Sequence, residues 1–195
     1  MARPKRIILL LLAVFVLAAC FIAGAYFLDY IVQTRVYKLD YAEQILENAA
    51  VYELQPALVA AIVHVESHSQ RDAVSPKGAV GLMQIMPDTG AWIYSKITGG
   101  EAADFDMSKL TDPDTNIAFG CWYMRFLLDK YNGDTKLALI AYNAGPGNLD
   151  KWLDDAEISP AGTLSRIPFA ETERYVEKIL QTKETYETLY EKELS

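Results

Sequence analysis

The sequence predicts a mostly α-helical domain that follows a single N-terminal transmembrane helix. Three observations carry this prediction: an uncharged apolar block near the start, apolar residues at helical spacing through the remainder, and no segment with the period-two alternation of a strand. A chain of 195 residues suits one domain of ordinary size plus an appendage.

The apolar block covers residues 7–28, which contain no charged side chain. As a helix it would be roughly 33 Å long, and the hydrocarbon core of a bilayer is about 30 Å thick. Arg3, Lys5 and Arg6 precede the block, so the positive-inside rule places the N-terminus in the cytoplasm and the domain outside. The predicted segments are a basic N-terminus (1–6), a transmembrane anchor (7–28), a stalk (29–40) and a catalytic domain (41–195).

Two other interpretations of the apolar block stay open. A cleaved signal peptide is one, although the apolar run is longer than the usual signal-peptide core. A lipoprotein signal is the other, because Leu17-Ala18-Ala19-Cys20 resembles a lipobox. The residues after Cys20 remain apolar where a lipoprotein usually turns polar, so an uncleaved anchor is favoured. Both the anchor and the lipoprotein interpretation tether the domain outside the membrane.

Charge and cysteine content narrow the class of protein. The formal net charge is −8, and the domain is more acidic still once the basic N-terminus is set aside. Such a domain is a poor nucleic-acid binder, and it must hold an anionic polymer by shape and hydrogen bonds rather than by charge. Cys121 is the domain's single cysteine and lies in an apolar helix, which predicts a small core residue and no internal disulfide.

Apolar residues at helical spacing predict the helices of the domain, and turn residues mark the connections between them. The predicted helices cover 41–53, 56–67, 87–97, 113–131, 134–142, 149–155 and 170–193. The predicted connections include 67–79, 98–112, 143–148 and 159–168.

Prolines and short polar side chains justify the predicted helix ends. Pro56 and Pro87 stand at first helical positions, where a missing N–H costs little. Asp112 and Asp134 each precede a helix, where the carboxylate accepts a hydrogen bond from a free backbone N–H. Asn132-Gly133 supplies residues suited to a helix end.

Glu66 is the residue around which a function is predicted. At helical spacing it shares a face with Val59, Ile62 and Val63, so the carboxyl continues an apolar stripe. Burial penalises the charged form, and the helix C-terminus does so too, so both raise the pKa of Glu66. A carboxylic acid that is still protonated near neutral pH can donate a proton in catalysis. A glutamate held by a buried partner for structure is the alternative.

A series of motifs surrounds Glu66 in order along the chain: Glu66-Ser67, Ser75, Gly81-Leu82-Met83-Gln84-Ile85-Met86-Pro87, Ala141-Tyr142-Asn143-Ala144-Gly145, Glu171 and Tyr175-Val176. Together they resemble the SLT-type lytic transglycosylases, whose catalytic domain is similar to goose-type lysozyme. The resemblance covers residues 41–190. It implies a lysozyme-like α-helical domain.

The resemblance also implies an activity: cleavage of the β-1,4 bond between N-acetylmuramic acid and N-acetylglucosamine in peptidoglycan, leaving a 1,6-anhydro end. Glu66 would act as general acid and then as general base, with peptidoglycan strands as the partner and no cofactor or metal. Most glycosidases need two carboxylates, but a hydroxyl on the same sugar ring is already positioned to attack. Asp72, Asp104 or Asp106 folded near Glu66 would leave a hydrolytic lysozyme open.

The resemblance assigns further site residues. The implied substrate-binding residues are Ser75, Met83, Gln84, Tyr142, Asn143 and Tyr175, and the implied supporting residues are Ser67, Gly81 and Glu171. Met83 would pack softly in the sugar cleft and Gln84 would hydrogen-bond the sugar. Tyr142 would hydrogen-bond Glu66 or the substrate, Gly81 would permit a close backbone approach, and Glu171 would be a buried structural acid.

Each of these residues also has a purely structural interpretation. Tyr142 and Tyr175 suit a core, Asn143 suits a helix C-cap, and Ser67 suits a polar position at a helix end.

Two further classes of function compete with this one. His64 and His68 have the i, i+4 spacing of zinc ligands on a helix. Glu66, however, points about 200° away from His64 and could not act on a water held there; both histidines are predicted to flank the cleft or face solvent. A tethered peptidoglycan-binding protein without activity is the other alternative, and a buried acid argues against it because a binder gains nothing from one.

Overall fold

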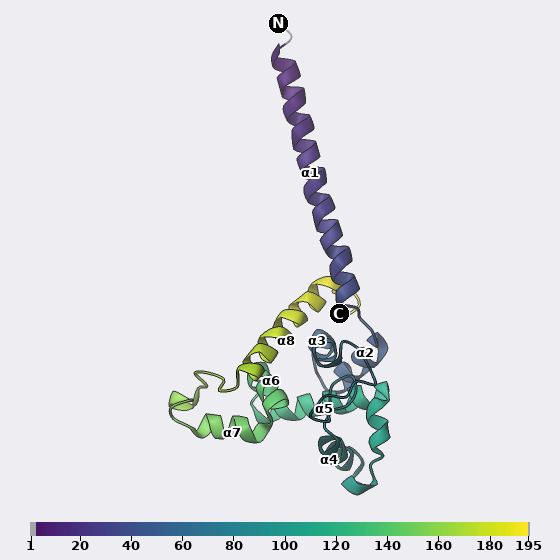
Figure 1. Cartoon of the computed structure of the whole chain (residues 1–195), viewed down its shortest axis with the longest axis vertical. Coiled ribbons are helices and arrows are strands. Elements are labelled where there is room, and N and C mark those ends of the chain that lie inside the picture. Colours follow the sequence, from purple (N-terminus) through teal and green to yellow (C-terminus); the bar gives the residue numbers. More distant parts are fainter. Residues whose placement is uncertain (1–2, 195) are drawn as a thin grey trace. The chain divides into compact units, whose positions relative to one another are not determined.

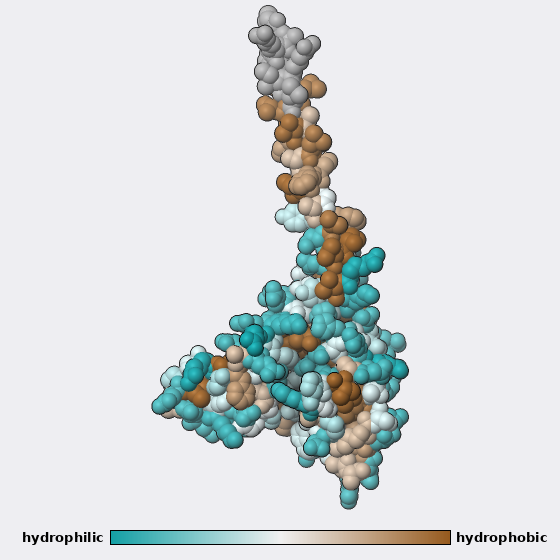
Figure 2. Space-filling view, in the orientation of Figure 1, coloured by the Kyte–Doolittle hydropathy of each residue, from teal (hydrophilic) through white to brown (hydrophobic). Residues whose placement is uncertain are grey.

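The computed structural model describes residues 3–194, apart from the side chains of residues 3–7, 10 and 161. The chain divides after Lys38 into two units. The first is a single helix, α1 (Arg3–Val36) (Figure 1). Exposed apolar side chains lie along it (Figure 2). Its part Leu11–Val36 is long and apolar enough to cross a membrane, a test that a signal sequence also passes.

Helix α1 extends beyond residue 28, the end of the predicted transmembrane anchor. It continues to Val36 and so includes most of the predicted stalk 29–40. The side chains of the predicted basic segment 1–6 lie outside the described residues, as does Ser195.

The second unit is a helical domain, as predicted. Its α-helices are α2 (Ala42–Val51), α3 (Pro56–Ser67), α4 (Pro87–Thr98), α5 (Pro113–Lys130), α6 (Thr135–Ala144), α7 (Pro146–Asp154) and α8 (Ala170–Leu189). Its 3-10 helices are η1 (Ala102–Asp104), η2 (Met107–Thr111) and η3 (Pro160–Gly162). Within residues 3–194 there is no strand, only isolated bridges from Val80 to Val74 and to Ile85.

Several predicted helix ends are confirmed by the capping contacts. The Asp112 carboxylate accepts a hydrogen bond from Thr115 N at 3.1 Å, and Asp134 accepts one from Leu137 N at 3.0 Å. Pro56 and Pro87 are the first residues of α3 and α4.

Parts of the predicted helix and loop pattern differ from the structure. The expected turn 143–148 contracts to Gly145, because its positive φ of 85° reverses the chain and Pro146 then starts α7 at once. Two 3-10 helices, η1 and η2, lie in the expected loop 98–112. Helix α8 ends at Leu189 instead of 193.

The core of the domain surrounds α3. Every residue of α3 from Ala57 to His64 is buried, and the helix packs on α2 and most extensively on α8 (Figure 1). Fully burying a side chain such as Ile62 contributes about 1.5–3 kcal/mol. Cys121 of α5 is buried as predicted, and burial raises the pKa of its thiol. This packing fixes the last turn of α3, which carries Glu66.

Candidate active site

Glu66 lies in the last turn of α3, where its carboxyl is largely removed from water. Desolvation raises the pKa of Glu66 from its ordinary value of 4.5 to about 7, and a hydrogen bond from Tyr175 opposes that rise. Among the described residues no charged neighbour contributes to the shift. The predicted rise in pKa is therefore confirmed, with burial as its main cause.

Two tyrosines from different helices approach Glu66. Tyr175 of α8, 9% exposed, donates its hydroxyl hydrogen to Glu66 Oε1 at 2.8 Å. Tyr142 of α6 donates instead to the Met83 carbonyl oxygen at 2.9 Å, so the bond predicted as one alternative between Tyr142 and Glu66 is made by Tyr175. Burial, and next the nearby Glu66 carboxylate, raise the pKa of both tyrosines well above 10, so both stay protonated.

The segment 81–86 forms a tight loop beside Glu66, and Asn116 of α5 anchors it. Asn116 is fully buried; its amide nitrogen donates to Val80 O at 3.0 Å and to Leu110 O at 2.8 Å, and its amide oxygen accepts from Met83 N at 2.7 Å. A Cβ at Gly81, where φ is 82°, would collide with the Asn116 amide and the Leu110 carbonyl. The close approach predicted at Gly81 is thus made to α5.

Met83 does not line a cleft, contrary to the expectation. Its side chain is 0% exposed and packs so closely on α5 that a Cβ at Gly120 would collide with its sulfur. The residue acts through its backbone, whose carbonyl receives the Tyr142 hydroxyl. Met86 is the exposed methionine of this loop, at 42%.

The polar side chains of the loop region mostly bond the protein itself. Ser67 donates to Leu82 O at 2.9 Å and so ties the end of α3 to the loop. Gln84, at a positive φ of 49°, donates through Nε2 to Gly81 O at 2.9 Å and to Ala73 O at 3.2 Å. Ser75 accepts from Ala79 N at 3.0 Å. These bonds hold the segment 73–84 together and tie it to the end of α3.

Glu171 is not the buried acid that was expected. Its side chain is 72% exposed and lies 3.8 Å from Lys77 Nζ. The buried neighbour is Thr172, whose hydroxyl donates to Asn143 Oδ1 at 2.7 Å and ties α8 to α6. Asn143 lies inside α6 and is exposed, so it is not a C-cap.

His64 and His68 lie in different environments. His64 is buried, contrary to the expectation of a cleft or solvent position, with its ring 6.1 Å from that of Tyr186. Burial, then His68 and Lys178, lower the pKa of His64. His68 is exposed and caps the C-terminus of α3. No group of three or more metal-ligating side chains occurs in the described part of the chain.

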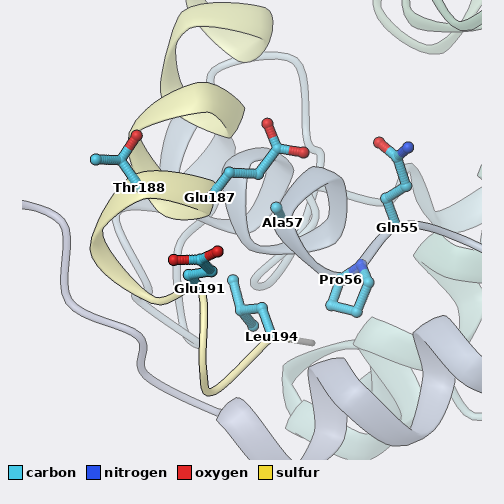
Figure 3. A pocket seen from close by; sticks show the side chains of 7 residues that line it. All are labelled: Gln55, Pro56, Ala57, Glu187, Thr188, Glu191 and Leu194. Carbon is cyan, nitrogen blue, oxygen red and sulfur yellow. The ribbon is translucent and has the colours of Figure 1, made fainter.

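A hollow of about 610 Å³ lies at the other end of α3 (Figure 3). Its lining residues are Gln55, Pro56, Ala57, Glu187, Thr188, Glu191 and Leu194. Pro56 is about 15 Å along the helix from Glu66 at the usual rise per residue. The hollow is therefore not part of the site around Glu66.

Asn116 and Thr172 position the site without facing it, and neither was predicted from the sequence. An asparagine next to Ile117 at the start of an apolar helix was a signal for Asn116, because a buried amide must find partners.

The carboxyl of Glu66 has a pKa near 7, so it can both release and take up a proton at neutral pH.

Known proteins share this architecture. The family model described as the transglycosylase SLT domain matches residues 43–162. The soluble lytic murein transglycosylase of Escherichia coli K12 is 34% identical over 132 residues, which are 66% of this chain and 20% of that protein. The membrane-bound lytic murein transglycosylase C of Actinobacillus pleuropneumoniae is 32% identical over 168 residues, covering 75% and 46%. The crystal structure of the 70-kDa soluble lytic transglycosylase of E. coli matches with a TM-score of 0.71 and 29% identity, covering 80% of this chain and 25% of that one.

Proposed function

The chain belongs to the transglycosylase SLT domain family, and on that basis we propose that it cleaves the β-1,4 bond between N-acetylmuramic acid and N-acetylglucosamine in peptidoglycan, leaving 1,6-anhydro ends. The chain spans only a fifth of its E. coli relative, so the activity rests on the site's own chemistry as well. The observation that carries the proposal is the pKa of Glu66, which desolvation of the carboxyl raises to about 7.

In the first step Glu66 is the general acid. Because Tyr175 donates to Oε1, that oxygen serves as an acceptor and the acidic proton belongs on Oε2. Oε2 gives this proton to the glycosidic oxygen as the bond from C1 to that oxygen breaks. The electron pair of the broken bond leaves with the released sugar hydroxyl.

In the second step Glu66 is the general base. Its carboxylate takes the proton of the C6 hydroxyl while the C6 oxygen bonds to C1, which closes the anhydro ring and restores the acid. Tyr175 stabilises the carboxylate between the steps through its 2.8 Å hydrogen bond. Tyr142 keeps the Met83 carbonyl, and with it the loop 81–86, in place beside the acid.

Hydrolysis is disfavoured because it needs a second carboxylate. No such group contributes to the pKa of Glu66 among residues 3–194. Asp72 is exposed beside Arg71, Asp104 is exposed in η1, and the Asp106 carboxylate accepts from Ser108. The sugar contacts are assigned to the accessible loop residues Gln84, Met86 and Ser75 and to the exposed Asn143.

The protein is further proposed to be anchored by α1 with its N-terminus in the cytoplasm and its domain facing the peptidoglycan. Helix α1 has the length and composition of a membrane span, and the A. pleuropneumoniae relative is named a membrane-bound enzyme.

Digestion of purified peptidoglycan followed by mass spectrometry tests the activity. The full-length chain in detergent is expected to release muropeptides lighter by one water than those with reducing ends, and Glu66→Gln is expected to release none while still binding glycan. Products with reducing ends alone would replace the transglycosylase with a lysozyme. Undiminished cleavage by Glu66→Gln would remove Glu66 from the mechanism.

A further inference from the structure

A second feature of the domain is a groove lined by aromatic rings on α4 and α5. It encloses about 410 Å³ and is lined by Asp88, Thr89, Trp92, Tyr123, Phe126 and Pro146. None of the four aromatic side chains at this place, Trp92, Trp122, Tyr123 and Phe126, is fully buried. Neither the acid–base chemistry of Glu66 nor the packing of α3 uses this groove.

The rings support one another and form a fixed wall. The Trp92 ring meets those of Trp122 and Phe126 edge-on, with centroids 5.2 and 5.1 Å away. The rings of Trp122 and Phe126 are nearly parallel, with centroids 5.7 Å apart and 3° between their planes. Edge-to-face and offset-stacked pairs are favourable arrangements. A wall of this kind presents aromatic faces without having to order flexible side chains when a ligand binds.

Three features place the groove near the site around Glu66. The Tyr123 ring lies 5.4 Å from that of Tyr142, which the Glu66 carboxylate influences directly. Asp88 follows Gln84 by four residues, and Pro146 follows Tyr142 by four. Four residues of chain reach at most about 14 Å. Part of the groove lining therefore lies close to the ends of the loop 81–86 and of helix α6.

The chemistry of the lining selects a neutral ligand with an apolar face. No basic side chain lines the groove, so nothing there pairs with an anion, and the Asp88 carboxylate repels one. Aromatic rings offer their faces to C–H groups, while Asp88 and Thr89 at the rim can bond hydroxyl or amide groups. A β-linked N-acetylated pyranose has this pattern, with C–H groups on its flat face and hydroxyl groups around its edge.

We propose that this aromatic groove is a further glycan subsite, in which a sugar of the strand beyond the cleaved bond stacks on the wall formed by Trp92, Tyr123 and Phe126. The proposal rests on the proposed function for the identity of the strand. A sugar bound in the groove would add binding contacts at a distance from Glu66. Such contacts suit an acidic protein, because it cannot attract an anionic substrate by charge.

Binding to long peptide-free glycan strands tests the subsite independently of cleavage. The Glu66→Gln chain, full length in detergent micelles, serves as the parent. Adding Phe126→Ala is expected to weaken binding between about threefold and tenfold, the range for one lost aromatic contact. Phe126→Leu, which keeps most of the packing, is expected to weaken binding in the same direction. Strand binding is also expected to change the tryptophan fluorescence of the parent, and Trp92→Phe to reduce that change.

Phe169→Ala is the matched control. Phe169 is 48% exposed and packs on Trp152, outside the groove, so its removal is expected to leave strand binding unchanged. Equal binding by the parent and both Phe126 variants overturns the subsite, as does an effect of Phe126→Ala confined to strands that carry peptide stems. Analysis of the products of the wild-type chain, done in parallel, separates the two proposals. Products without anhydro ends would count against the proposed function. The ratios of strand binding between the variants would still show whether the groove is a glycan subsite.

Discussion

Replacing Glu66 with glutamine should change how the stability of the protein depends on pH. Glutamine has nearly the shape of the protonated acid and can still accept the Tyr175 hydrogen bond, but it does not titrate. The folded-state pKa of Glu66 is about 7, against an ordinary value of 4.5. The folded wild-type protein therefore holds a proton that the unfolded chain has already released between these two pH values.

The sign of the effect follows from proton linkage. Because the folded state binds more protons than the unfolded state across this window, the free energy of unfolding falls as pH rises. The stabilisation is fully present below pH 4.5 and is lost once pH has passed about 7. A pKa difference of this size corresponds to about 3 kcal/mol at 1.36 kcal/mol per unit.

The assay is urea unfolding of the full chain in detergent, followed by tryptophan fluorescence at pH 4 and at pH 8. The stability of Glu66→Gln minus that of wild type should rise by about 3 kcal/mol between these pH values. Other titrating groups are common to both proteins and cancel in the difference. A difference that stays constant with pH would show that Glu66 is solvated, and the acid–base argument would fail with it.

Two further predictions concern the partner of Glu66 and the membrane. Tyr175→Phe removes a hydrogen bond that lowers the pKa of Glu66, so the alkaline limb of the pH profile of kcat/KM should move to higher pH. The value of kcat should fall roughly 10- to 100-fold. An alkaline limb at the wild-type pH would contradict the role of Tyr175. Cys20→Ala should leave the protein in the membrane fraction after cell lysis, because α1 itself is the proposed anchor; release into the soluble fraction would favour a lipid anchor on Cys20.

Glu66 was predictable because its environment is local. Its helix is apolar on nearly every side, so a carboxyl in the last turn had to be desolvated whatever packed against it. The direction of its pKa follows from that fact alone. The identity of its hydrogen-bond partner did not follow, because Tyr175 comes from a helix 109 residues away along the chain.

Glu171, which was predicted to be buried, and Thr172, which is buried, are neighbours that differ by one residue's rotation around the axis of α8. On α8, Thr172 is about 20° from Ile179 around the helix and Glu171 about 80°. Ile179 is fully buried, so Thr172 faces inward and Glu171 reaches solvent. The packing of α8 on α3 decides which face of α8 turns inward. The spacing of apolar residues predicts that face only approximately.

The loop 81–86 differs from its prediction for another physical reason. A motif made of glycine, methionine and glutamine suggests side chains that contact a ligand, but here most of its atoms are committed to the protein. Asn116 pairs with the Met83 N–H, and Tyr142 pairs with the Met83 carbonyl. The Met83 side chain then fills the space that Gly120 leaves open on α5. The tertiary partners of the backbone, absent from any local pattern, decided which methionine faces outward.

The raised pKa of Glu66 reflects two opposing influences, and their opposition is what the proposed reaction requires. Desolvation alone would make Glu66 a weak acid that releases its proton reluctantly. The Tyr175 bond alone would keep it ionised, with no proton to give. A group that serves first as acid and then as base works best when its pKa lies near the ambient pH, where neither form is scarce. Buried α3 raises the pKa and the Tyr175 hydroxyl lowers it, so a single carboxyl can perform both proton transfers.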